Sequence, residues 1–188
     1  MSRVLLVTGA RSLATRPGAE AWARALIAEA LAGADLLIVG DAPGPDAWAW
    51  EIAESQWFDP VRWQPNRVHR RRIHCYATQG SFTGDVILHD GFPVGGGHFA
   101  VEAESRWAAT KRPRGGEELR QWLLSRNVAM IDEASTWHRS PVPPAVSVLA
   151  LLDGLKHDAP SLRAARGTEH TVGLARGAGL SVRREVWR

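Results

Sequence analysis

Three short turns of the sequence carry residue types that bind phosphate. The first is Thr8-Gly9-Ala10-Arg11-Ser12, which follows an apolar run that begins at Val4. Glycine at the end of a strand lets the backbone approach a ligand, and an arginine beside it is suited to pair with a phosphate. An ordinary strand-to-helix loop with a solvated arginine is the alternative interpretation. We take Gly9, Arg11 and Ser12 as candidate ligand-binding residues.

The second turn is Gly40-Asp41-Ala42-Pro43-Gly44-Pro45-Asp46, and a helix is predicted to follow it. A helix start has free backbone N–H groups and the positive end of the helix dipole, so it favours anions. Gly40 and Gly44 keep side chains out of the way, and Asp41 or Asp46 is suited to accept hydrogen bonds from ribose hydroxyls. A capping role explains either aspartate equally well.

The third turn is Arg166-Gly167-Thr168-Glu169-His170-Thr171. Glycine followed by a hydroxyl residue at a helix start is a second anion cradle, although the same pair is also plain capping chemistry. Two such cradles in one chain indicate a shared anion more strongly than either one alone. Gly167 and Thr168 therefore join the candidate ligand-binding residues.

The elements between these turns predict an α/β fold. Apolar runs typical of strands buried on both faces alternate with segments of helical spacing. We predict a Rossmann-like open parallel sheet of about five strands flanked by helices. In such a sheet, ligands bind beyond the carboxyl ends of the strands. The strands are expected at residues 3–9, 35–40, 61–63, 145–152 and 182–187, and the helices at 18–33, 45–56, 117–124, 126–134 and 168–178.

The alternation breaks between about residues 66 and 125, which we interpret as an insertion in a single domain of residues 1–188. This stretch holds the densest basic run of the chain, which is suited to a polyphosphate or nucleic-acid backbone and is equally typical of a solvated face. Histidines, a cysteine and an aspartate in the same stretch match no familiar metal-site spacing, so we predict no metal and no cofactor. The basic run is Arg67, Arg70, Arg71 and Arg72, and the other residues are His69, His74, His89, His98, Cys75 and Asp90.

Composition agrees with one globular domain. The chain has 188 residues, 45% hydrophobic and 23% charged, with a net charge of +3. This mild excess permits anionic ligands without demanding nucleic acid. The single cysteine excludes an internal disulfide, and the first apolar run is too short for a signal peptide or a membrane span. We therefore expect a cytoplasmic protein with no membrane partner.

The order of these pieces resembles the SLOG superfamily, whose members include YspA-like proteins, LOG lysine-decarboxylase-like phosphoribohydrolases and DprA-like proteins. The resemblance covers about residues 1–65 and 125–188, and its YspA-like branch is the most similar. It is carried by the three turns above together with Ser125-Arg126-Asn127-Val128-Ala129-Met130.

The resemblance implies a Rossmann-like domain that binds nucleotides, NAD-derived molecules or ADP-ribose-like ligands, and it implies a homodimer. It places Arg126 near the ligand phosphate or sugar, with Asn127 beside it. LOG enzymes carry a catalytic glutamate three residues after the threonine of their Gly-Thr motif, where this chain has Thr171. The nearby acid is Glu169, which would have to act from a shifted register.

We therefore expect a small-molecule ligand derived from a nucleotide, such as a nucleoside monophosphate, NAD or an ADP-ribose-like molecule. Its phosphate is expected against residues 40–46 and 167–168, with charge from Arg11 and Arg126 and a sugar contact from Asp41 or Asp46. If the protein is an enzyme, it is a hydrolase of the N-glycosidic bond, with Arg126 and Glu169 as catalytic residues. The alternative is a DprA-like nucleic-acid-binding module that uses the basic insertion.

Overall fold

The computed structural model describes eight stretches of the chain: residues 3–40, 42–57, 72–76, 87–93, 99–102, 116–140, 145–157 and 166–188. Their strands are β1 (Arg3–Gly9), β2 (Leu36–Gly40), β3 (Arg72–Tyr76), β4 (Ile87–Pro93), β5 (Phe99–Glu102), β6 (Ala145–Asp153) and β7 (Ser181–Trp187). Their helices are η1 (Arg11–Thr15), α1 (Ala19–Leu31), α2 (Pro45–Trp57), α3 (Gly116–His138), α4 (Gly154–His157) and α5 (Arg166–Gly177).

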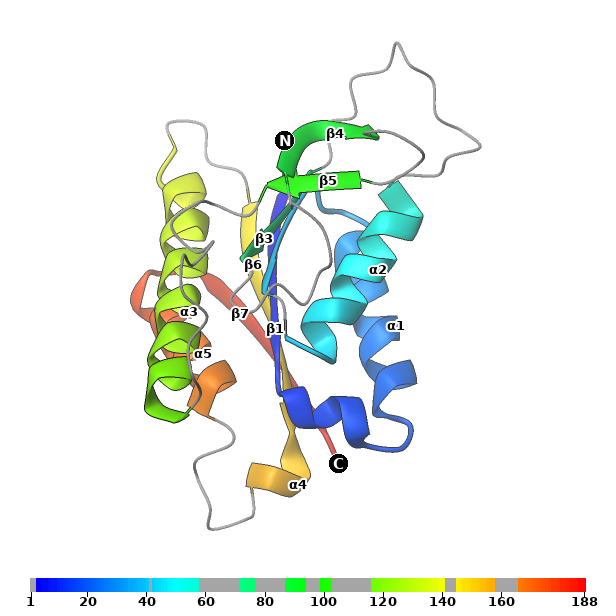
Figure 1. Ribbon diagram of the computed structural model, residues 1–188, viewed down its shortest axis with the longest axis vertical. Coiled ribbons are helices and arrows are strands. Elements are labelled where there is room, and N and C mark those ends of the chain that lie inside the picture. Colours follow the sequence, from blue (N-terminus) through cyan, green and yellow to red (C-terminus); the bar gives the residue numbers. More distant parts are fainter. Residues whose placement is uncertain are drawn as a thin grey trace.

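The main sheet has five parallel strands in the order β3-β2-β1-β6-β7. Helices α1 and α2 cover one face of this sheet, and α3 and α5 cover the other (Figure 1). The predicted Rossmann-like α/β fold is therefore confirmed. Because the chain adds strands first on one side of β1 and then on the other, the strand order reverses between β1 and β6. Ligands bind at such a reversal in open α/β sheets.

Successive side chains of β1 point to opposite faces of the sheet, which explains why its sequence is apolar at successive positions. Leu5 and Val7 belong to the core that contains α1 and α2, whereas Val4 and Leu6 belong to the core on the α3 side. All four side chains are at most 3% exposed. A strand with a core on each face needs apolar residues pointing both ways, as parallel sheets require.

The segment from 66 to 125 contributes to the main sheet. Its residues 72–76 form β3, which pairs in parallel with β2 from Leu36↔Arg72 to Gly40↔Tyr76. The predicted third strand at residues 61–63 lies outside the described residues. The same segment forms a separate antiparallel pair, β4 and β5. Residues 117–124 and 126–134 are helical as predicted, but they belong to one helix, because α3 runs unbroken through Ser125.

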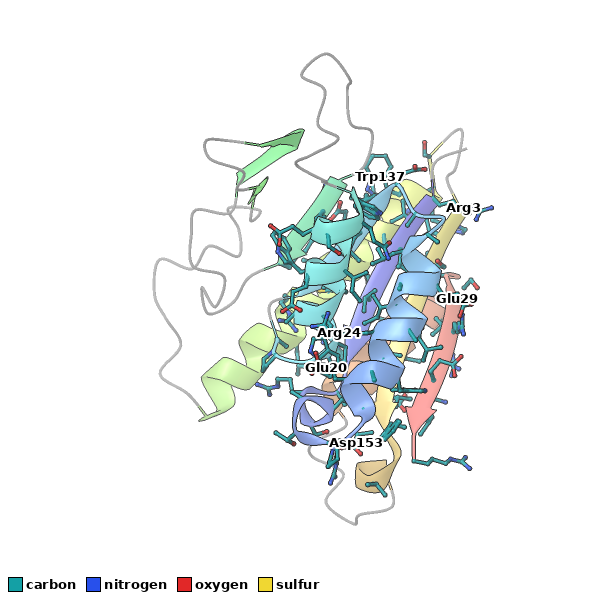
Figure 2. All side chains as sticks on the ribbon, turned by 90° about the vertical axis from the view of Figure 1, so that its right-hand side faces the viewer. Arg3, Glu20, Arg24, Glu29, Trp137 and Asp153 are labelled. Atoms are coloured by element: carbon teal, nitrogen blue, oxygen red, sulfur yellow. The ribbon has the colours of Figure 1, made fainter. Side chains whose placement is uncertain are left out.

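Both edges of the sheet are visible in Figure 2, where Arg3 marks the amino edge and Asp153 the carboxyl edge. Helices α1, α2 and α5 each follow a strand of the main sheet and therefore begin at the carboxyl edge. Among the described helices, none is both long and apolar enough to cross a membrane.

Candidate functional site

Buried polar side chains gather at the carboxyl edge of the sheet. The described residues include eight buried polar or charged side chains, and seven of them lie at strand ends, at helix starts or in α3 beside them. Burial of polar groups costs free energy unless they are paired, so a concentration of them in one place marks a built site. The seven are Thr8, Asp46, Arg126, Asn127, Asp153, Thr168 and Thr171.

Asp46 and Arg126 form a buried ion pair across the end of β2. Asp46 stands in the first turn of α2 and Arg126 in α3, so the two come from helices on opposite faces of the sheet. Arg126 Nη2 lies 3.8 Å from Asp46 Oδ2, and the side chains are 8% and 4% exposed. Asp46 Oδ2 also accepts a hydrogen bond from the backbone N–H of Ala42 at 3.3 Å.

Gly40 makes this ion pair possible. A Cβ atom at residue 40 would lie 2.4 Å from Asp46 Oδ2 and 2.7 Å from Arg126 Cζ. Neither carbon–oxygen nor carbon–carbon contacts reach such distances without displacement, so a larger residue here would force Asp46 or Arg126 to shift. The sequence suggested that Gly40 keeps side chains away from a ligand, and in the fold it makes room for the protein's own charged pair.

Asn127 connects this ion pair to the start of α5. Its Oδ1 accepts from Arg126 Nη2 at 3.5 Å, and its Nδ2 donates to the carbonyl oxygen of Gly167 at 3.1 Å. Thr171 Oγ1 donates to the same carbonyl, also at 3.1 Å. The contacts therefore run continuously from α2 through α3 to α5. The two predicted anion cradles, at residues 40–46 and 167–168, are thus joined by Arg126 and Asn127.

Thr168 differs from its neighbours in the first turn of α5. Its side chain is buried, with 5% of the residue exposed. In the described part of the chain its hydroxyl has no hydrogen-bond partner, whereas the Thr171 hydroxyl donates to the carbonyl oxygen of Gly167. The first N–H groups of a helix have no partner within the helix either. The start of α5 therefore offers a hydroxyl and backbone donors to a ligand.

The other predicted catalytic residue, Glu169, faces the neighbouring strand β7. Its Oε1 accepts from Arg184 Nη2 at 2.5 Å, and its side chain is 31% exposed. The contacts of Arg126 lead to Asp46 and Asn127, so the two predicted catalytic residues sit in different ion pairs.

The first predicted turn forms the strand-to-helix connection after β1. A Cβ atom at Gly9 would lie 2.3 Å from Cγ of Pro45, so this glycine allows the start of α2 to pack on the end of β1. Arg11 is exposed and Ser12 half-buried at the start of η1. The backbone of Ser12 accepts a hydrogen bond from Thr15.

The remaining predicted residues belong to the second turn and to the basic run. Gly44 is buried and has a φ of +91°, a conformation that favours glycine whether or not a ligand is near. Asp41 lies outside the described residues, and so do Arg67, Arg70 and Arg71 of the basic run. Among the described residues, no group of three or more histidine, cysteine or acidic side chains is arranged to hold a metal ion.

A second buried acid, Asp153, was missed by the sequence reasoning. It ends β6, next to the reversal of strand order, and its Oδ2 accepts from Nε of Arg16 at 3.1 Å. The Asp153 side chain is 1% exposed. The available signal was its position as the first charged residue after an apolar run.

Each of the three acids described at this edge is matched by an arginine, so these three pairs add little net charge. Asp46 pairs with Arg126, Asp153 with Arg16, and Glu169 with Arg184. Recognition of an anion here would therefore depend on oriented donors more than on excess positive charge. No family model, curated protein or solved structure matches this chain.

Proposed function

We propose that the carboxyl edge of the sheet binds a nucleotide-derived small molecule by its phosphate. The candidates are a nucleoside monophosphate, NAD or an ADP-ribose-like molecule. One observation carries the proposal: the first turn of α5 is held by Asn127, and the hydroxyl of the largely buried Thr168 still has no partner among the described residues. A helix start with an added hydroxyl donor suits a phosphate.

The phosphate is assigned to α5 instead of α2. The carboxylate of Asp46 already stands at the start of α2 and accepts the N–H of Ala42, so a second anion there would be repelled. Pro45, the first residue of α2, has no N–H to donate. Asp46 is better suited to accept a hydrogen bond from a ligand hydroxyl.

The charge for binding is assigned to Arg11 and Arg126 in different ways. Arg11 is exposed at the end of β1 and is suited to pair with a phosphate from solvent. Arg126 is buried against Asp46, so its main effect is to hold Asn127 and Asp46 in place. Preorganised donors of this kind bind an anion without the cost of ordering them first.

Binding is tested by adding AMP, NAD, ADP-ribose and inorganic phosphate separately to the purified protein and following thermal unfolding and titration heat. At least one nucleotide is expected to raise Tm. Thr168→Val is expected to lower the affinity for that nucleotide roughly tenfold, which corresponds to the loss of one hydrogen bond to a charged group. The matched control is Thr136→Val, an exposed threonine of α3 that bonds only its own helix in the described structure. No stabilisation by any of these compounds would remove the proposal.

Hydrolysis of the N-glycosidic bond extends the proposal, because Glu169 follows Thr168 directly and is partly exposed. A carboxylate there is suited to activate water or stabilise an oxocarbenium-like transition state, once it leaves Arg184. Chromatography would detect free base released from AMP or nicotinamide released from NAD. Release that is lost in Glu169→Gln supports the enzyme, and binding without release leaves a sensing or carrier function.

A further inference from the structure

A second, partly buried cluster lies between α3 and β3. Its centre is Glu133 of α3, whose side chain is 16% exposed. Tyr76 Oη donates to Glu133 Oε2 at 2.5 Å, and Trp137 Nε1 donates to Oε1 at 3.3 Å. His74 Nδ1 contacts the same Oε1. One carboxylate therefore receives three donors, two of them from β3.

The protonation state of this cluster follows from its chemistry. Burial raises the pKa of Glu133, but the hydrogen bonds from His74, Tyr76 and Trp137 and the charge of His74 lower it by more, so the net shift is downward. An ionised carboxylate only accepts hydrogen bonds, so Nδ1 of His74 carries the proton in this contact. Glu133, His74, Tyr76 and Trp137 thus form a clamp, in which directional hydrogen bonds link the helix to the strand.

The clamp and Arg126 lie on the same side of α3. Glu133 follows Arg126 by seven residues, or about two helical turns, which places them roughly 10 Å apart along the helix. Met130 lies between them and is 1% exposed in the core of this face. On the strand side, Tyr76 is the register partner of Gly40, beside which Arg126 reaches Asp46.

Apolar packing alone defines the rotation and the axial position of a helix on a sheet only loosely, because hydrophobic contacts are non-directional. Hydrogen bonds to both oxygens of one carboxylate define the rotation and the axial position of the helix. Along α3, the clamp therefore determines where the guanidinium of Arg126 and the amide of Asn127 lie.

We propose that Glu133, with His74 and Tyr76, is a positioning group that sets Arg126 and Asn127 for ligand binding. The expected effect of this group on ligand affinity rests on the proposed function, whereas its expected effect on Arg126 rests on the structure alone. Glu133 does not touch the ligand in this scheme.

The test uses the whole protein, two readouts and a matched control. Glu133→Gln preserves the size of the side chain but places an amide where only acceptors fit. The control is Ile73→Val in β3, the strand that also carries His74 and Tyr76. The Ile73 side chain faces the core on the opposite side of the sheet, where the residue is 1% exposed. The first readout is the Arg Nε–Hε region of the ¹H–¹⁵N NMR spectrum without ligand, with the Arg126 signal assigned by its loss in Arg126→Lys.

The Arg126 signal is expected to shift or broaden in Glu133→Gln and to stay in place in Ile73→Val. The second readout is the affinity for AMP, expected to fall about tenfold in Glu133→Gln, within the coupling seen between residues of one network. In the Arg126→Lys background the same substitution is expected to change affinity less than twofold, while its effect on Tm persists.

An Arg126 signal that moves no more in Glu133→Gln than in the control would overturn the inference. An affinity loss that is undiminished in the Arg126→Lys background would do the same. Absence of AMP binding by the native protein would count against the proposed function, and the spectrum would still decide the positioning of Arg126.

Discussion

The starts of α2 and α5 look alike in sequence and differ in the fold. Each is a glycine-containing turn before a helix, and each suggests an anion cradle. At α2 the protein supplies the anion itself, since Asp46 accepts the N–H of Ala42 and pairs with Arg126. At α5 the carbonyl of Gly167 is held by two side chains, while the Thr168 hydroxyl has no partner among the described residues.

A glycine-rich turn is therefore stronger evidence for close packing than for a bound ligand. Gly9 admits Pro45, and Gly40 admits the Asp46–Arg126 pair. The Cβ position of Gly167, by contrast, meets no atom of the described residues within 4 Å beyond its own stretch of helix. A glycine that the fold does not need for packing is the better candidate for contact with a ligand.

The largest effect is expected from Gly40→Ala, which tests whether the α2 turn is built around the ion pair. The added methyl would displace Asp46 or Arg126, and overpacking together with a broken buried pair should lower the free energy of unfolding by about 3 kcal/mol. Urea unfolding at 25 °C measures this change.

The control is Gly173→Ala in α5, where the new Cβ meets no atom of the described residues within 4 Å outside its own helix backbone. There the stability should rise by about 0.5 to 1 kcal/mol, because alanine suits a helix better than glycine. Equal effects of the two substitutions would show that the close approach at Gly40 is not what the fold depends on.

A smaller effect is expected from Asp46→Asn, which separates stability from binding at α2. Arg126 would lose the charge of its partner, and the free energy of unfolding should fall by about 2 kcal/mol. The affinity for a phosphate held at α5 should change less than about threefold, a change worth roughly 0.6 kcal/mol. Titration with inorganic phosphate measures it.

Glu29→Gln serves as the comparison for Asp46→Asn, since it breaks the exposed pair with Arg183 and should leave the free energy of unfolding almost unchanged. A loss of inorganic-phosphate binding in Asp46→Asn of tenfold or more would move the phosphate site to α2 and reverse the contrast between the two turns.

Much of the sheet could be predicted because its strands carry cores on both faces. Their apolar runs are continuous, and the expected strands at 3–9, 35–40, 145–152 and 182–187 agree with β1, β2, β6 and β7 within a residue. Strand β3 escaped prediction because it mixes residue types, Arg-Ile-His-Cys-Tyr. Its apolar Ile73 faces one core, and its polar His74 and Tyr76 meet Glu133 on the other face.

The site was less predictable because it depends on pairs that are distant in sequence. Asp46 and Arg126 are 80 residues apart, and nothing in their local sequence shows that they meet beside Gly40. Asn127 was expected beside Arg126, yet its bond to Gly167 depends on how α3 crosses α5. Periodicity locates helices and strands, whereas these contacts follow from the packing of α3 on the sheet.

The smallest effect concerns pH and asks whether α3 holds the two helix starts together. The pKa of Glu133 is lower in the fold than its ordinary value of 4.5, because its hydrogen bonds outweigh its burial. A lowered carboxyl pKa stabilises the fold above the ordinary pKa, and this stabilisation is lost as pH falls through the lower, folded pKa. The free energy of unfolding of the native protein should therefore exceed that of Glu133→Gln by about 1 kcal/mol at pH 6. The difference should shrink below pH 4.5, in unfolding curves recorded at matched ionic strength. A difference that stays constant down to pH 3 would show that the Glu133 carboxylate does not clamp α3, and Arg126 and Asn127 would then need another explanation for their common setting.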